Sequence, residues 1–240
     1  MARQRRVGIA SLTATLVLIA VAGCSAEGDA KSPGGDAKPL PTRSGAAGGS
    51  APEVDGTLPG VPTAEQALTE LAGLKVAPHG SMSGYSRDRF PHWASQGENC
   101  NTRETVLNRD GANVRRDTEC RAVSGTWRSV YDDLTFKEAA ELDIDHTVPL
   151  ANAWRSGANK WPQEKRKEFA NDLTNPQLLA VSAASNRSKG DQGPDEWQPP
   201  SKTYWCTYAR AWTSVKATYE LSVTASEKDM LGQMLDTCSS

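Results

Sequence analysis

The sequence predicts an α+β domain, in which a small antiparallel sheet is surrounded by helices and stapled by disulfides. Two helix starts carry capping boxes, Thr63 with Gln66 and Thr224 with Glu227. Short stretches between them are typical of strands, and Gly, Asp and Asn residues that favour turns bound them. Four cysteines lie between residue 100 and the end of the chain, and an even number of cysteines in an exported domain favours disulfides.

The first 24 residues have the pattern of an export signal. Arginines near the start precede an apolar run, 7–22, that is too short to be a comfortable membrane span. The run ends in Val21-Ala22-Gly23-Cys24, which resembles a bacterial lipobox. We therefore expect 1–24 to be a lipoprotein signal peptide and Cys24 to be lipidated. An ordinary signal peptide with a chance cysteine is the alternative, and an uncleaved anchor is a further one.

Residues 25–62 are rich in Gly, Ala, Pro and Ser and almost lack large apolar side chains. Such a segment cannot bury enough surface to order itself, so it is expected to be a disordered tether. The chain has 240 residues. That length leaves one domain, 63–240, after the signal and the tether.

The overall charge excludes strong electrostatic steering, because 27 Lys and Arg residues face 29 Asp and Glu residues. Binding to a nucleic acid would therefore depend on a local basic patch. The most basic stretch is 160–167. A solvated helix face and a surface that contacts a nucleic-acid backbone both explain it.

Four cysteines remain once Cys24 is set aside: Cys100, Cys120, Cys206 and Cys238. Three pairings are possible. We favour the local one, in which the first two and the last two cysteines pair, because each pair then brackets a compact unit. A zinc site is the competing interpretation, but no two of these cysteines have Cys-x-x-Cys spacing.

The elements before the middle of the chain follow from apolar spacing and turns. A first helix is expected at 63–74. Tyr85, Phe90 and Trp93 then serve as packing anchors, and His79 and His92 are interpreted as surface or packing residues. Asp110-Gly111 indicates a turn, and strands follow at 125–131 and 142–148, which we expect to lie in one antiparallel unit.

The second half of the chain is predicted to be mainly helical. Trp161-Pro162 opens a helix that ends at Ala170, and a short apolar element covers 178–181. Ser182 caps a helix, 183–189, that stops at Gly190. Helices at 203–219 and 224–238 would form an antiparallel pair that brings Cys206 beside Cys238.

A candidate site gathers around Asp145-His146. His146 is the histidine with carboxylates beside it, and its ordinary pKa suits a general base. Asp145, on the opposite face of a strand, could hold a metal ion together with the side-chain oxygen of Asn186. Oxygen ligands favour Mg²⁺, which Mn²⁺ can replace. Asp143 shares a face with Asp145 and competes for the ligand role.

The remaining candidate residues are expected either to position the catalytic side chains or to contact the substrate. Asn175 could orient His146 or brace its loop. Lys189 and Arg187 could contact substrate phosphates. Arg103 could do the same, although an arginine in that position more often makes a structural ion pair.

Three ordered blocks carry a resemblance to a known family. They are Asp145-His146-Thr147-Val148-Pro149-Leu150, Asn175-Pro176-Gln177-Leu178-Leu179 and Asn186-Arg187-Ser188-Lys189-Gly190-Asp191. Together they resemble an HNH endonuclease, the ββα-metal or His-Me finger fold, with Asn186 where many members have His. The longer pattern is similar to exported HNH proteins related to the C-terminal domain of GmrSD-type restriction enzymes. It includes Trp154, Ser156-Gly157-Ala158, Phe169 to Leu173, Pro194, Trp197 and Pro199-Pro200.

The resemblance implies a ββα-metal core and an activity. His146 would be the general base, Asp145 and Asn186 the metal ligands and Asn175 an orienting residue. The motif core would occupy 100–200, followed by the helix pair of 203–238. The gap between the first two blocks, which holds the Trp161 helix, is longer than in the shortest HNH motifs. This difference affects the expected shape of the substrate groove rather than the chemistry.

The expected function is therefore an exported, metal-dependent endonuclease that hydrolyses DNA, or RNA, outside the cell. It would be secreted or held at the outer face of the cell membrane by a lipid on Cys24. The rival interpretation is a non-catalytic surface module that uses a nuclease-derived scaffold to bind a polymer or a partner. Retention of Asp145, His146, Asn175, Asn186 and Lys189 together favours the enzyme.

Overall fold

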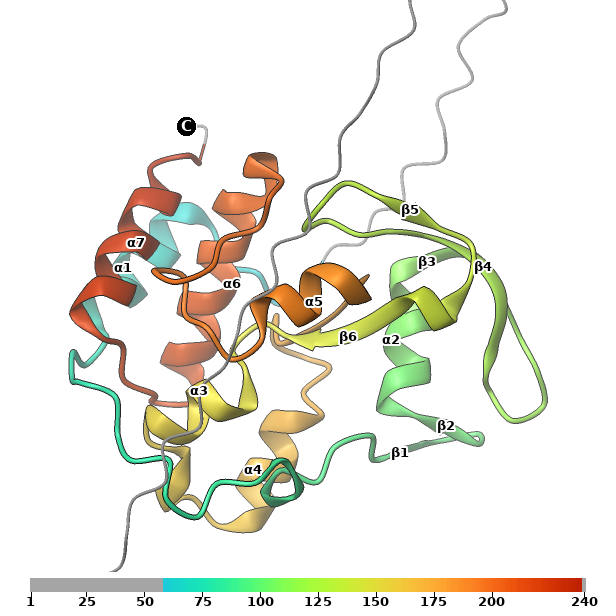
Figure 1. Ribbon diagram of the computed structural model, residues 1–240, viewed down its shortest axis with the longest axis horizontal. Coiled ribbons are helices and arrows are strands. Elements are labelled where there is room, and N and C mark those ends of the chain that lie inside the picture. The colour runs from blue at the N-terminus through green and yellow to red at the C-terminus, as the bar shows by residue number, and fades with distance from the viewer. Residues whose placement is uncertain (1–57, 239–240) are drawn as a thin grey trace, which may run out of the picture. The chain divides into compact units, whose positions relative to one another are not determined.

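The computed structural model describes residues 58–238, which form a mixed α+β fold (Figure 1). Its helices are α1 Ala64–Gly73, α2 Thr102–Asp110, α3 Leu150–Arg155, α4 Gln163–Ala170, α5 Ala183–Lys189, α6 Trp205–Thr218 and α7 Ala225–Leu235. Single 3-10 turns are η1 Arg87–Arg89, η2 Ala139–Glu141, η3 Ala158–Lys160 and η4 Lys202–Tyr204. The strands are β1 Ser95–Gly97, β2 Cys100–Asn101, β3 Gly111–Arg116, β4 Ala122–Arg128, β5 Thr135–Phe136, β6 Leu142–His146 and β7 Leu178–Ser182. The predicted α+β class is confirmed.

The strands form three small antiparallel sheets in the described part of the chain, with orders β1-β2, β3-β4-β5 and β6-β7. The expectation of one antiparallel unit that joins 125–131 to 142–148 is wrong. Strand β4 pairs with β3 and β5, whereas β6 pairs with β7. The partner of β6 is thus a distant segment, which local turn signals do not reveal.

Helix α2 occupies a stretch that the sequence did not predict to be helical. Asn101 caps it, because its side chain accepts a hydrogen bond from the backbone N–H of Glu104. Val106 and Leu107 are its buried apolar residues. They pack against Ile144 of β6 and its neighbours, so α2 covers one face of the β6-β7 sheet.

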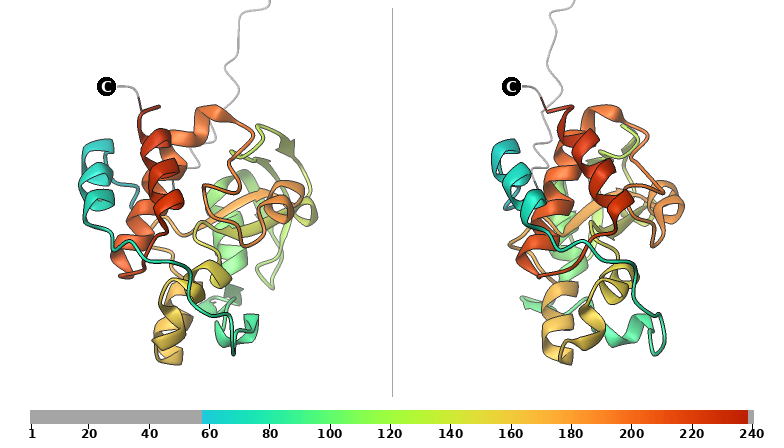
Figure 2. Two further views of the ribbon diagram at one scale, coloured as in Figure 1. Left: turned by 60° about the vertical axis from the view of Figure 1, so that its left-hand side comes forward. Right: turned by 90° about the vertical axis from the view of Figure 1, so that its left-hand side faces the viewer.

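Helices α1, α6 and α7 lie side by side and close the larger core (Figure 2). Both predicted capping boxes are present, at Thr63 and at Thr224. The ordered part begins before residue 63, because Leu58 is buried in this core. Arg210 of α6 also donates a hydrogen bond to the carbonyl of Pro62 at 2.6 Å. Residues 58–62 are therefore part of the fold, contrary to the prediction that the tether extends to residue 62.

Both predicted disulfides are confirmed. Cys100 bonds Cys120, and the Cα atoms lie 5.1 Å apart. Cys206 at the start of α6 bonds Cys238 beyond α7, with Cα atoms 4.9 Å apart. The competing zinc interpretation falls, because all four sulfurs are used in these two bonds.

The predicted signal peptide 1–24, the lipidation at Cys24 and residues 25–57 of the tether lie outside the described residues. Within 58–238, no helix has the length and apolar character that crossing a membrane requires.

Candidate active site

Strands β6 and β7 and helix α5 follow one another in space as a ββα unit. Asp145 pairs with Leu179 and His146 with Leu178 across the sheet. Successive side chains of a strand point to opposite faces, so Asp145 and His146 leave the end of β6 on opposite sides. Ile144, on the His146 side, packs in the core under α2. Asp145 faces α5 and α6 instead.

His146 is fixed and neutral. Only 4% of it is exposed, and its Nε2 lies 3.0 Å from the carbonyl oxygen of Ala170. A carbonyl can only accept, so Nε2 carries the proton and Nδ1 keeps its lone pair. Burial lowers the pKa of His146 to about 3, although the Ala170 carbonyl opposes that shift. The imidazole is therefore uncharged near neutral pH.

Trp93 holds the imidazole from the side. The two ring centroids are 6.0 Å apart, with 32° between the ring planes. Trp93 has a φ of +60°, which is a rare conformation for a bulky residue. The ring of His92 stands edge-on to Trp93 at 5.2 Å. His92 is thus a packing residue, as expected, and the pair limits the orientations that His146 can take.

Lys189 is an internal partner of Asp145 rather than a surface contact. Its Nζ lies 2.5 Å from Oδ2 of Asp145 and 2.8 Å from the carbonyl of His146, and the side chain is 0% exposed. Burial raises the pKa of Asp145 and lowers that of Lys189, and each charge opposes the shift of the other. The predicted phosphate contact of Lys189 is incompatible with this placement.

Tyr131 completes the support of Asp145. Its hydroxyl donates to the same Oδ2 at 2.6 Å. The ring of Tyr131 packs edge-on against Trp197 and Tyr208, at 5.2 and 5.8 Å. Trp212 of α6 lies over Lys189, with 5.8 Å between Nζ and the ring centroid. The carboxylate of Asp145 is therefore held by residues from two separate parts of the chain, and Trp212 covers the lysine from a third.

Asn186 and Arg187 lie on α5 beside Asp143, on the Asp145 face of β6. The amide nitrogen of Asn186 donates to Oδ2 of Asp143 at 3.2 Å. The guanidinium of Arg187 lies 3.9 Å from the same oxygen, and its side chain is 78% exposed. Arg187 is therefore accessible to a substrate, as its predicted role requires, and Asp143 orients both side chains.

One cavity of about 270 Å³ joins these side chains. Asp145 and His146 line it together with Asn186 and Arg187. The other lining residues are Tyr85, Arg87, Ile144, Pro149, Leu150, Ala151, Gly190 and Asp191. Four of the predicted site residues thus share one opening at the end of β6, although the sequence separates them into two blocks.

Asn175 does not lie in this cavity. Its amide nitrogen donates to Oδ2 of Asp172 at 2.7 Å, and its backbone N–H donates to the other oxygen at 2.9 Å. It lines a separate cavity of about 620 Å³, together with Tyr219. No hydrogen bond within 58–238 connects Asn175 to His146, so its predicted orienting role is not what the structure gives it. It braces its own loop.

Gln177 braces a different loop, the one that follows His146. Its side-chain oxygen accepts from the N–H of Val148 at 3.1 Å, and its amide donates to the carbonyl of Val148 at 3.0 Å. Its backbone carbonyl also accepts from the N–H of Thr147 at 2.7 Å. Gln177 is fully buried and closes the loop that follows His146. The sequence placed Gln177 inside the second block but gave it no role.

Arg103 has the structural role that the sequence offered as its alternative. It pairs with Glu104 at 2.8 Å and donates to the carbonyls of Ala139 and Leu142 at 3.1 and 3.4 Å. It ties α2 to η2 and the start of β6. Its predicted contact with substrate is not supported by this placement.

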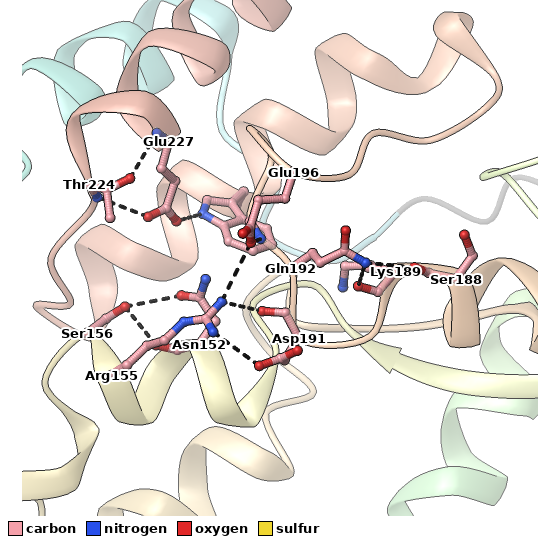
Figure 3. Close-up of polar contacts among 12 residues, drawn as sticks. Asn152, Arg155, Ser156, Ser188, Lys189, Asp191, Gln192, Glu196, Thr224 and Glu227 are labelled. Atoms are coloured by element: carbon pink, nitrogen blue, oxygen red, sulfur yellow. Dashed lines mark hydrogen bonds and ion pairs between the residues drawn. The ribbon is translucent and has the colours of Figure 1, made fainter. Parts of the chain in front are cut away.

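The loop after α5 is held against α3 and forms one wall of the cavity (Figure 3). Arg155 donates to the carboxylate and to the carbonyl of Asp191 at 3.1 and 2.6 Å. Gln192 donates to the carbonyls of Ser188 and Lys189, which close the end of α5. The wall is thus fixed from both sides.

Tyr85 and Arg87 are cavity residues that the sequence did not assign to the site. They precede the first block by a long stretch, and Tyr85 was interpreted only as a packing anchor. The signal that could have identified them is weak. It consists of an arginine and aromatics in a segment otherwise rich in Gly and Ser.

Comparisons with known proteins identify one similar protein and one family. An "Uncharacterized secreted protein" of Arthroderma benhamiae is 56% identical over 182 residues, which is 76% of this chain and 89% of that protein. No solved structure matches the chain. Residues 101–234 match the family described as "GmrSD restriction endonucleases, C-terminal domain". That span contains β6, β7 and α5, and it covers more than half of the sequence. The chain therefore belongs to the family of GmrSD restriction endonuclease C-terminal domains.

Proposed function

We propose that the protein is an exported, metal-dependent endonuclease that hydrolyses phosphodiester bonds of DNA, or of RNA. The observation that carries the proposal is the placement of His146. A neutral imidazole with an unprotonated nitrogen lines the same small cavity as Asp145, Asn186 and Arg187. The membership in a family of restriction endonuclease domains supports the same chemistry.

His146 would act as the general base. Its Nδ1 takes part in no hydrogen bond with residues 58–238, so it is available to accept a proton from water. The water oxygen attacks phosphorus, and the bond from phosphorus to the leaving oxygen breaks. The pKa of about 3 belongs to the substrate-free protein. A bound phosphodiester brings negative charge, which favours the protonated imidazole that this step produces.

Asp145 and Asn186 are the residues that would hold a Mg²⁺-type ion, for which Mn²⁺ could substitute. No hydrogen bond among residues 58–238 uses Oδ1 of Asp145 or Oδ1 of Asn186. This oxygen pair fits a hard cation that keeps several waters. The same part of the chain contains no group of three or more His, Cys, Asp or Glu side chains suited to a metal. When bound, the ion would stabilise the negative charge that develops on the phosphate oxygens.

Plasmid nicking tests the proposal directly. The purified protein should nick supercoiled DNA with Mg²⁺ or Mn²⁺ and should not nick it with EDTA. His146→Ala should abolish nicking, whereas His79→Ala, on an exposed histidine outside the cavity, should retain it. Equal nicking by wild type and His146→Ala would refute the assignment. A wild type that binds DNA but cuts it with no divalent cation would support the non-catalytic binding module instead.

Export and anchoring belong to the same proposal. The similar protein from Arthroderma benhamiae is named as secreted, and two disulfides suit an oxidising compartment. Lipidation at Cys24 would move the protein into the detergent phase of a membrane extract, and Cys24→Ser would leave it in the aqueous phase. Identical partitioning of the two forms would exclude the lipid anchor.

A further inference from the structure

Two arginines line the cavity that contains His146, and Arg87 is the one that forms no ion pair with residues 58–238. It begins the η1 turn and lines the cavity that contains His146. Arg103, Arg109 and Arg155 each form an ion pair with a carboxylate. Arg87 forms none with any residue in 58–238.

His92 orients Arg87 while leaving most of its donors free. Nε of Arg87 lies 3.4 Å from Nε2 of His92, and Nδ1 of His92 lies 2.9 Å from the carbonyl of Phe90. Because that carbonyl can only accept, Nδ1 carries the proton and Nε2 accepts from Arg87. Neither terminal nitrogen of Arg87 bonds to a residue in the described part of the chain. They are the two NH₂ groups that recognise a planar oxyanion pair.

The two guanidinium groups that line the cavity lie on opposite sides of β6. Arg187 approaches Asp143, on the face that carries Asp145 and α5. Arg87 instead contacts His92, whose ring stands on Trp93, and Trp93 packs against His146 on the face that lies under α2. Strand β6 pairs only with β7 among the described strands, so its other edge is free. The cavity therefore has one available cation on each side of the end of a strand.

The local carboxylates do not compete for Arg87. Asp145 is held by Lys189 and Tyr131, Asp143 by Asn186, and Asp191 by Arg155. The cation is thus left for a ligand that enters the cavity. Two guanidinium groups that flank a cavity of about 270 Å³ suit an anion with several oxygens, and a phosphodiester is such an anion.

We propose that Arg87 is a substrate-binding residue that contacts a backbone phosphate on the His146 side of the cavity, opposite Arg187. The inference rests on the proposed nuclease function and extends it by a residue outside the three sequence blocks. A phosphate contact carries no base information, so Arg87 strengthens binding to every sequence about equally. It also makes binding dependent on salt, because each neutralised phosphate releases counterions.

A binding experiment on the full-length chain isolates this role. The background is His146→Ala in EDTA, so that no cleavage interferes, and the probe is a fluorescein-labelled 20-mer DNA followed by anisotropy. Arg87→Ala should raise Kd roughly tenfold, the scale of a lost charge-assisted hydrogen bond. The slope of log Kd against log salt should fall by about 1. Arg89→Ala is the matched control, because Arg89 lies on the same turn and exposes its side chain outside the cavity.

The outcomes separate the two proposals. If Arg87→Ala keeps its melting temperature and binds DNA with the wild-type Kd and salt slope, the inference is overturned even if the wild type nicks plasmid. An equal loss in Arg89→Ala also overturns it, because the effect would then be general charge. A wild type that shows the Arg87 effect but never nicks DNA would keep the inference and refute the nuclease. Nicking kinetics give a second readout, because Arg87→Ala should raise KM more than it lowers kcat.

Discussion

Nζ of Lys189 lies 2.5 Å from Oδ2 of Asp145, and neither side chain is more than 5% exposed. The pair joins the last turn of α5 to the end of β6. A buried ion pair adds little to stability relative to an apolar pair, but removal of one partner leaves the other charge without compensation. The placement of Asp145 therefore depends on Lys189, as a ligand depends on the residues that orient it.

Replacement of Lys189 should destabilise the fold strongly. Lys189→Met leaves the Asp145 carboxylate buried with Tyr131 as its hydrogen-bond donor, and we expect a loss of about 3–5 kcal/mol in the free energy of unfolding. Urea denaturation measures this loss. Lys167→Met, on the exposed side of α4, is the control and should stay within about 0.5 kcal/mol of wild type. A Lys189→Met protein as stable as the control would contradict the role assigned to the pair.

Gln177 should matter for stability and for activity together. Gln177→Ala removes the partners of the N–H and the carbonyl of Val148, and each buried group left unpaired costs about 1–3 kcal/mol. Because the same loop follows His146, the nicking rate of the folded variant should also fall. Gln163→Ala, on an exposed position at the start of α4, should change neither quantity. A Gln177→Ala protein with normal nicking would show that the brace serves the fold alone.

Acid should destabilise the protein through His146. Its folded-state pKa of about 3 lies below the value of about 6.5 expected in the unfolded chain. The unfolded state therefore binds more protons between these values. Stability from this residue is complete above about pH 6.5 and is lost as the pH falls toward 3. His146→Gln should flatten the pH dependence of the unfolding free energy in that window. An unchanged slope in His146→Gln would contradict the burial of a neutral imidazole.

Each disulfide should contribute separately to stability. The bonds close segments of 20 and 32 residues, for which loss of a bond costs roughly 2–5 kcal/mol. We expect Cys100→Ser/Cys120→Ser and Cys206→Ser/Cys238→Ser to lower the melting temperature, and addition of reductant to lower that of the wild type further than either. Unchanged melting with reductant, after thiol titration has confirmed free cysteines, would contradict the stapling role.

Local signals predicted the helical elements well. The bounds of α5, its Ser182 cap and its Gly190 stop are as expected, because each depends on residues within one turn of the helix. Helix α2 was not predicted, because Val106 and Leu107 are its only buried apolar residues and give little helical periodicity, although Asn101 with Glu104 three residues later is a helix-start signal. The pairing of β6 with β7 depends on contacts between distant segments, which no local pattern encodes.

The candidate site divides in the same way. The sequence could predict that four residues share one cavity, because the blocks that contain them were recognised by their residues and order. These residues are Asp145, His146, Asn186 and Arg187. The positions of Lys189, Asn175 and Arg103 could not be predicted. A residue type states what a side chain can do, but burial decides whether it can reach solvent, and burial arises only when the fold is complete.

Trp212 covers Lys189, and this contact limits which parts of the domain can be removed or grafted. A graft limited to the three blocks would leave α6 behind, and the ion pair under Trp212 would then face water. The three blocks therefore cannot be transferred to another protein without α6. A chimaera, a truncation or a circular permutant that keeps the buried ion pair must carry the C-terminal helices along with the blocks, so the minimal domain extends to about residue 238 rather than to about 200.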